Sequence, residues 1–320
     1  MGGFLGPSPM GVKQEIHSVR KVFWPTPQHR PRHITPVRAR PWWWIAVWLL
    51  LAVNGLAAED ATAAAPLTAR YRVHVGGIAV LDATVRLDLT DRAYRIDVTA
   101  ENGGFLAKIL PWKTDSHSEG VRESGGLRPL RHRQSSVFRE KPRSVALDYA
   151  ADGALTATVL PPPQEDDRAP VPPDLQRGAL DPLSAGLLAL LAVGDGNACA
   201  RTVPVFDGRR RYDLRFDPGG MRPLAASRYS IFSGVAQECR LSVIPIAGQA
   251  KSSSALTAFW RRDDDPSPRP AGPPTDLWLA PLLPGAPPLP VRMESDSAFG
   301  AVVIHLIGLT REGDPPRAIP

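Results

Sequence analysis

Hydrophobic and polar side chains alternate with a period of two over much of the chain from residue 70 onward. The first such runs are 70–75, 83–89 and 94–101, and they are separated by Gly76-Gly77 and by a short turn at 91–93. This period is typical of β-strands that bury one face and expose the other. Because the separating segments are short, we expect neighbouring runs to pair as antiparallel hairpins.

Further runs continue this pattern toward the C-terminus. They lie at 145–149, 155–159, 212–217 and 256–260. The run 299–309 is apolar on both faces, which predicts a central, well-covered strand. Glycines and bulges, such as those expected at Gly76-Gly77, would bend the strands. The pattern predicts a mainly β fold, with a strongly curved antiparallel sheet in the form of a half-barrel or β-spiral.

One segment, 181–192, departs from the β pattern. Its sequence DPLSAGLLALLA is apolar nearly all round, which indicates a buried helix. Asp181 suits the N-cap, Pro182 suits the first helical position, and Gly194 suits the end. We expect this helix to pack in the concavity of the curved sheet.

Composition divides the chain into a leader, a spacer, one domain and a tail. Their predicted bounds are 1–57, 58–69, 70–309 and 310–320, and the tail is expected to be disordered. Two parts of the domain, 161–182 and 262–290, contain seven and ten prolines. Such compositions favour extended, solvated chain, so we predict long loops in both places.

The leader contains a candidate secretory signal peptide. The run WWWIAVWLLLAVNGLAA at 42–58 follows Arg38 and Arg40 and ends in small residues, which predicts cleavage after Ala57 or Ala58 and export to the periplasm. The alternative is an uncleaved anchor in the inner membrane, with the tryptophans at the interface. Membrane contact is expected only through this segment, if it is uncleaved. We expect the long stretch before it to result from a start codon assigned too far upstream.

The charge of the chain gives no support for a nucleic-acid partner. Lys and Arg outnumber Asp and Glu by 38 to 32, but residues 1–58 hold seven of the basic residues against one acidic residue. The remainder is formally neutral, whereas a nucleic-acid-binding domain needs a basic face. The hydrophobic content of 43% is too high for a disordered chain.

Cys199 and Cys239 are the two cysteines of the chain. In an oxidising compartment, two cysteines predict one structural disulfide. The alternative is two separate reduced thiols. Neither cysteine lies in a Cys-x-x-Cys motif or near a histidine, so we predict no metal site.

The common catalytic motifs are absent. The chain has no Gly-x-Ser-x-Gly, no His-Glu-x-x-His and no phosphate-binding Gly-rich loop with lysine. The histidines after the leader, His74, His117, His132 and His305, share no helical metal-binding spacing. We predict no catalytic residue and no cofactor, and the residues that bind a ligand stay unassigned.

Two sets of residues have alternative interpretations. Arg209–Arg211 follows Asp207-Gly208, which predicts a hairpin turn with the arginines on the wet side; a phosphate or anionic-lipid contact is the alternative. The aromatic residues either pack in the core or line an apolar cavity inside the sheet. They are Trp112, Phe138, Phe206, Phe216, Trp260 and Trp278.

Several blocks of sequence together resemble an exported bacterial family, domain of unknown function 3108. The blocks are YRVHVGGIAVLDATVRLDL (71–89), DPLSAGLLAL (181–190), VFDGRRRYDLRF (205–216), FSGVAQECRLSVIPIAG (232–248) and parts of 277–306. The resemblance implies a periplasmic or envelope-associated β protein without established catalytic residues. It also implies a broad similarity to the curved-sheet carriers that shuttle lipoproteins or lipids across the periplasm.

These observations favour a non-catalytic binding module of the cell envelope. Its expected ligand is a lipid, a lipoprotein or an envelope protein. One alternative is a scaffold whose edge strands pair with an envelope partner. The other is a hydrolase, which requires convergent titratable groups in one pocket.

Overall fold

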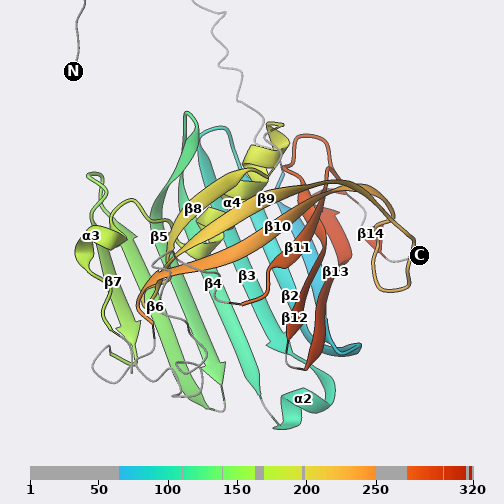
Figure 1. The fold of residues 1–320 in the computed structure, drawn as a ribbon, viewed down its shortest axis with the longest axis horizontal. Coiled ribbons are helices and arrows are strands. Elements are labelled where there is room, and N and C mark those ends of the chain that lie inside the picture. Colours follow the sequence, from blue (N-terminus) through green and yellow to red (C-terminus); the bar gives the residue numbers. More distant parts are fainter. Residues whose placement is uncertain are drawn as a thin grey trace, which may run out of the picture. The chain divides into compact units, whose positions relative to one another are not determined.

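The computed structural model describes residues 65–318, with gaps at 110, 139, 163–168, 197–198, 250–271, 298 and 315–316. In these residues the strands form one antiparallel sheet of 14 strands (Figure 1). The first seven strands are β1 (Leu67–Val75), β2 (Ile78–Leu89), β3 (Ala93–Asn102), β4 (Trp112–Glu123), β5 (Gly126–Phe138), β6 (Lys141–Tyr149) and β7 (Leu155–Leu160). The others are β8 (Arg201–Phe206), β9 (Arg211–Leu224), β10 (Gly234–Ala247), β11 (Thr275–Ala280), β12 (Leu289–Ser297), β13 (Gly300–Arg311) and β14 (Arg317–Ala318). The helices are α2 (Gly104–Ile109), α3 (Pro173–Gln176) and α4 (Pro182–Gly194).

The sheet curves strongly and stays open. Its order is β7-β6-β5-β4-β3-β2-β1-β13-β12-β11-β10-β9-β8, with β14 beside β13, so β7 and β8 are its edges. Figure 1 shows β8, β9 and β10 crossing in front of the strands from the other half of the sheet. This arrangement confirms the predicted mainly β fold with a curved antiparallel sheet.

The sequence between β7 and α4 lies beside the edge of β8. The Leu180 amide donates a hydrogen bond of 2.9 Å to the Pro204 carbonyl, and the Phe206 amide donates one of 2.9 Å to the Leu180 carbonyl. Val171 and Ala179 are buried in a cluster with Phe206. The prediction of a solvated loop over 161–182 is therefore wrong for its second half, because apolar side chains between the prolines are needed to cover the sheet edge.

The helix α4 forms as the sequence predicts and packs inside the curve of the sheet. The Asp181 side chain caps it by accepting hydrogen bonds of 3.0 Å from the Leu183 and Ser184 amides, and Pro182 opens its first turn. Leu187 packs in the core cluster of β1–β3 and β12–β13, whereas Ala185 and Ala189 pack against β8–β11. The helix thus contacts both halves of the sheet.

Residues 262–290 are not one long loop, as the structure places β11 within them. Leu277 and Leu279 alternate into the core, and β11 pairs with both β10 and β12. In the described part of this segment the prolines flank the strand rather than interrupt it, so its amide groups remain free to pair. The high proline content of this segment therefore led to the prediction of a loop where the short strand β11 forms.

The predicted spacer and tail are both partly folded. The strand β1 begins at Leu67, because Leu67 and Ala69 already alternate into the core. The strand β13 continues to Arg311, and β14 pairs with it through Gly308 and Ala318. Both domain bounds that the sequence predicts, 70 and 309, are thus too narrow.

The run 299–309 forms β13, which lies between β1 and β12 as a central strand. It is less covered than predicted, since only its C-terminal part, around Leu306 and Leu309, is fully buried. The Ile231 amide, from the loop between β9 and β10, donates a hydrogen bond of 3.0 Å to the Leu306 carbonyl. The predicted signal segment 42–58 and the run 256–260 lie outside the described residues. In the part of the chain that the structure describes, no helix is long and apolar enough to cross a membrane.

Candidate functional site

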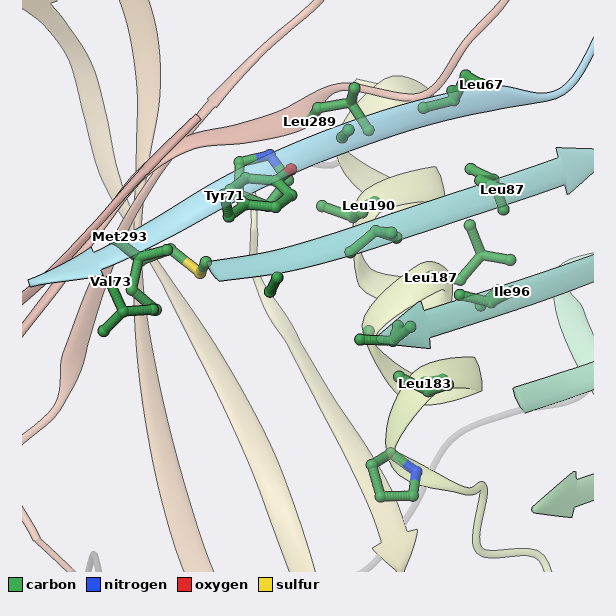
Figure 2. Close-up of a pocket in the computed structure, with 18 residues that line it drawn as sticks. Leu67, Tyr71, Val73, Leu87, Ile96, Leu183, Leu187, Leu190, Leu289 and Met293 are labelled. Atoms are coloured by element: carbon green, nitrogen blue, oxygen red, sulfur yellow. The ribbon is translucent and has the colours of Figure 1, made fainter. Parts of the chain in front are cut away.

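An apolar cavity of about 290 Å³ lies between α4 and the inner face of the sheet. Its strand side is formed by alternate residues of β1, β2 and β3, which face the helix because side chains of a strand alternate between its two faces. Figure 2 shows Leu67, Tyr71, Leu87 and Ile96 on this side. Leu187 and Leu190 of α4 lie opposite them. We call this space the first lobe.

A second lobe of about 270 Å³ lies between α4 and the strands β8–β12. Phe216, Leu241 and Leu277 line it, together with both cysteines. The two lobes share five lining residues, which are Pro182, Gly186, Leu190, Pro290 and Met293. The two lobes therefore meet along one side of α4. A single ligand could occupy both of them.

Gly186 keeps this meeting point open. A Cβ atom added at Gly186 would have no heavy atom within 4 Å, so the helix leaves room here rather than packing tightly. An apolar cavity of about 150 Å³ is enough to stay dry and bind benzene, and each lobe is roughly twice that size. The space is thus large enough for an apolar ligand larger than benzene.

The side chains that line the two lobes are almost all apolar. Tyr71 is the polar side chain in the first lobe, and burial raises the pKa of its hydroxyl, so that it stays neutral at ordinary pH. In the second lobe, Arg201 is the one charged residue among the lining residues that the structure describes. No carboxylate or histidine lines either lobe within the described ranges.

A buried polar cluster fixes α4 above the sheet. The Ser118 hydroxyl of β4 donates a hydrogen bond of 2.6 Å to Asp181, and His132 Nδ1 of β5 lies 2.8 Å from that hydroxyl. Ser184 donates to the second carboxylate oxygen and lies 2.7 Å from the Tyr94 hydroxyl of β3. Side chains of three strands thus hold the first turn of the helix, and this helix lines both lobes.

The Asp181 carboxylate is held in its charged form. Burial on its own raises the pKa of Asp181, but hydrogen bonds from His132, Ser118 and Ser184 and the charge of His132 outweigh it, and the net pKa lies below the usual value. Two helix amides add further support, since negative charge is favoured at a helix N-terminus.

This cluster contains a serine, a histidine and an aspartate, but its geometry differs from that of a catalytic triad. Ser118 and His132 both contact the same oxygen of Asp181, and the side chains of His132 and Asp181 are 2% and 0% exposed. None of these three residues lines the lobes described above. A nucleophile must reach its substrate, so the geometry supports a structural role. Sequence reasoning found Asp181 only as a helix cap and missed its partners on β4 and β5.

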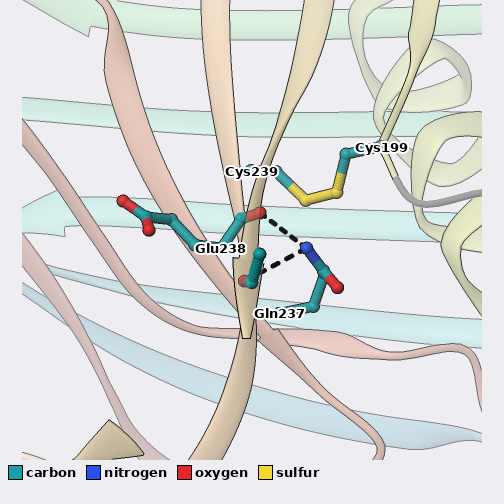
Figure 3. The surroundings of a disulfide bond; sticks show 5 residues. Cys199, Gln237, Glu238 and Cys239 are labelled. Atoms are coloured by element: carbon teal, nitrogen blue, oxygen red, sulfur yellow. Dashed lines mark hydrogen bonds between the residues drawn. A yellow bond between two sulfur atoms is a disulfide. The ribbon is translucent and has the colours of Figure 1, made fainter. Parts of the chain in front are cut away.

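A disulfide joins Cys199, which follows α4, to Cys239 on β10, with their Cα atoms 5.8 Å apart. This is the pairing that the sequence predicts. The side-chain Nε2 of the neighbouring Gln237 donates hydrogen bonds of 3.2 Å to the Gly220 carbonyl and 2.8 Å to the Glu238 carbonyl (Figure 3). The chain that leaves the helix is thereby tied to the sheet beside the second lobe.

The family model described as "Protein of unknown function (DUF3108)" matches residues 70–307, which is most of the chain. The chain belongs to the DUF3108 family. No curated protein matches it. A solved structure from Brucella abortus, described as a beta-barrel-like protein of domain of unknown function DUF1849, has 11% sequence identity and a TM-score of 0.44. That alignment covers 78% of this chain and 98% of the other.

The histidines of this DUF3108 protein do not gather into one site. His132 lies in the cluster of Asp181, and His117 Nδ1 lies 2.7 Å from Asp97 on the surface. His74 and His305 meet on the outer side of β1 and β13, where their rings lie 5.3 and 5.8 Å from the ring of Tyr229. Among the described residues, no group of three or more possible ligands is arranged to hold a metal ion.

The pair His74 and His305 predicts a loss of stability in mild acid. Burial, the charge of Arg292 and the neighbouring His74 lower the pKa of His305 to about 4, with Glu294 opposing them, and burial also lowers the pKa of His74. The unfolded chain therefore takes up protons near pH 6.5 before the folded domain does. The free energy of unfolding should be full above that pH and should fall between about pH 6.5 and 4.

The measurement is the melting temperature at steps from pH 7.5 to 4.5. The variant His305→Gln should show a shallower decline than wild type, because it removes one of the groups that bind a proton only after unfolding. Parallel curves for the two proteins would contradict the assignment of the decline to His305.

The Asp207-Gly208 turn forms as predicted between β8 and β9. Asp207 accepts hydrogen bonds of 3.0 and 2.7 Å from the amides of Arg209 and Arg210. Arg211 is not on the wet side as predicted, because its guanidinium turns back to Asp213, and its side chain is only 14% exposed. Arg209 and Arg210 line a separate polar pocket of about 270 Å³.

Of the aromatic residues named in the sequence analysis, some line the cavity and others pack in the core. Phe216 lines the second lobe, and Phe206 packs in the core beside Val171 and Ala179. Trp278 is partly buried, with the Arg292 guanidinium 5.3 Å from its ring. Trp260 lies outside the described residues. The cavity is therefore lined mainly by aliphatic side chains. The only sequence signal for those on the strands is the period-two alternation, which predicts that they face inward.

Proposed function

We propose that this protein binds an alkyl chain of a lipid or lipoprotein in the two lobes around α4, as a non-catalytic module of the cell envelope. The observation that carries the proposal is the joined apolar space between the helix and the inner face of the sheet. Transfer of apolar surface from water into such a space is favourable by roughly 25 cal/mol per Å². Among the described residues, Arg201 is the one charged residue that lines these lobes.

The proposed location in the envelope rests on separate observations. The segment 42–58 has the layout of a signal peptide. The disulfide between Cys199 and Cys239 is typical of proteins that fold in an oxidising compartment. Export also brings the domain to a place where alkyl chains of lipids and lipoproteins are abundant.

The direct test is native mass spectrometry of the protein exported to a bacterial periplasm and purified without detergent. We expect an added mass that disappears on denaturation and matches a lipid. A bare mass, together with no binding of added alkyl probes, would reject the proposal and favour an envelope-protein partner.

A substitution at Gly186 tests the site itself. The variant Gly186→Leu places a side chain in space that is open in both lobes, without a clash at the Cβ. Affinity for a fluorescent alkyl probe should fall about tenfold to a hundredfold, because the leucine excludes several methylene groups worth ~0.8 kcal/mol each.

The matched control is Gly186→Ala. It gains the same kind of helix propensity, up to ~1 kcal/mol, but fills the space with one methyl group only. Its affinity should stay within about threefold of wild type, since one methyl group displaces at most about one methylene. Unchanged binding by Gly186→Leu, with a melting temperature at or above that of wild type, would place the probe elsewhere.

A further inference from the structure

Arg201 faces the second lobe from the first position of β8. Residues of this strand alternate, and Val203 and Val205, on the same side as Arg201, are 1% and 0% exposed. Across the strand pair Arg201 lies opposite Phe216, which also lines the lobe. The Arg201 side chain therefore lies on the inner side of the sheet, where it lines the second lobe.

This guanidinium has no ion pair or hydrogen bond with any residue that the structure describes. Arginines on neighbouring strands differ, since Arg215 pairs with Asp217 at 3.1 Å and Arg240 pairs with Asp276 at 2.9 Å. A cation beside apolar surface is stabilised most by an anion that accepts hydrogen bonds from it. Within the described residues the lobe supplies none.

The position of Arg201 is fixed by the covalent frame of the lobe. Its amide donates a hydrogen bond of 2.9 Å to the carbonyl of Cys199, and Cys199 is tied to Cys239. Both cysteines line the same lobe as Arg201. The start of β8 is thus held against the cavity rather than left as a free end.

We infer that Arg201 binds the carboxylate of a single-chain fatty acid whose alkyl chain occupies the two lobes. This inference rests on the proposed function and adds the class of ligand. A guanidinium can form two parallel hydrogen bonds with a carboxylate. Among the described residues that line the lobe, Arg201 is the one charged group, so a larger head group with several charges finds no second charged partner there.

The test compares palmitate with methyl palmitate, which keeps the chain but has no charge. The full exported protein should bind palmitate about tenfold to a hundredfold more tightly, as expected for a charge-assisted hydrogen-bonded pair. In Arg201→Gln that preference should vanish, so that palmitate and methyl palmitate bind this variant with equal affinity. Arg201→Lys should retain part of it and serves as the second variant if the glutamine variant does not fold.

The control is Arg215→Gln on the adjacent strand β9, whose side chain pairs with Asp217 outside the lobe. It should keep the palmitate preference of wild type. Equal affinities of wild type for the acid and the ester would overturn the inference but leave the proposed function intact. Preference for hexadecyl phosphate over palmitate would overturn the carboxylate assignment, and failure to bind any of the three would reject the proposed function itself.

Discussion

Replacing Asp181 with alanine is expected to lower the free energy of unfolding by about 4 kcal/mol. The substitution removes the cap of α4 and leaves the hydrogen-bonding groups of Ser118, His132 and Ser184 buried without their acceptor. Loss of a cap alone costs about 1 kcal/mol, whereas breaking a buried charged pair costs ~3–5 kcal/mol. Urea denaturation at pH 7 measures the change, provided that the denaturant slope stays constant.

Two further variants separate the causes. Asp181→Asn keeps an acceptor for the helix amides but removes the charge, so its loss should be intermediate. Asp152→Ala removes a carboxylate that accepts a hydrogen bond from the Ala154 amide in an exposed turn, and should cost less than about 1 kcal/mol. A similar loss for the alanine variants at 181 and 152 would contradict the role of the buried cluster.

The pH dependence of the Asp181 contribution has a defined sign. Because the folded-state pKa lies below the usual value, the stabilisation is fully present above the unfolded pKa near 4 and is lost as the pH falls through the folded pKa. The gap in stability between wild type and Asp181→Ala should therefore be constant near neutrality and should narrow only in strong acid. Alkyl binding should also weaken in this variant, since the cluster holds α4 above the cavity.

Replacing both Cys199 and Cys239 with serine is expected to destabilise the exported protein by a similar amount, about 4 kcal/mol in the chain-entropy model. The two cysteines lie 40 residues apart in sequence, so the bond removes much conformational freedom from the unfolded chain. Both cysteines also line the second lobe, where the more polar serine side chains would pack less favourably.

Thermal unfolding of periplasmic material with and without reductant measures the effect. Wild type should lose stability on reduction and approach the double variant, and the double variant should not respond to the reductant. Equal melting of oxidised wild type and the double variant would show that the bond does not stabilise the fold.

The sequence by itself determined the kind of secondary structure wherever local chemistry was decisive. Period-two alternation located β1, β2 and β3, because each strand there buries one face against apolar side chains. Asp181 and Pro182 located the start of α4, because a cap acts on its own first turn. Two cysteines in a chain with a signal-like leader were enough to predict their pairing.

Only the tertiary structure decided what lies inside the sheet. The strands β4 and β5 escaped prediction because their inward positions include Thr114, Ser118, Gly120 and His132, whose polar or small side chains break the apolar alternation. Ser118 and His132 are tolerated inside because Asp181, 63 residues away from Ser118, contacts both of them. A partner so distant in sequence leaves no local signal.

The cavity and the position of Arg201 beside it were also decided by the tertiary structure. In the sequence, Gly186 indicates only a low helix propensity at that position. The open space beside it arises because α4 packs against both halves of the sheet. Arg201 is one of many arginines in the sequence, and the register of β8 on β9 places it beside Phe216. Local sequence determines which residues can form a strand or a helix, whereas the position of a cavity depends on how distant elements meet, and that is a property of the whole fold.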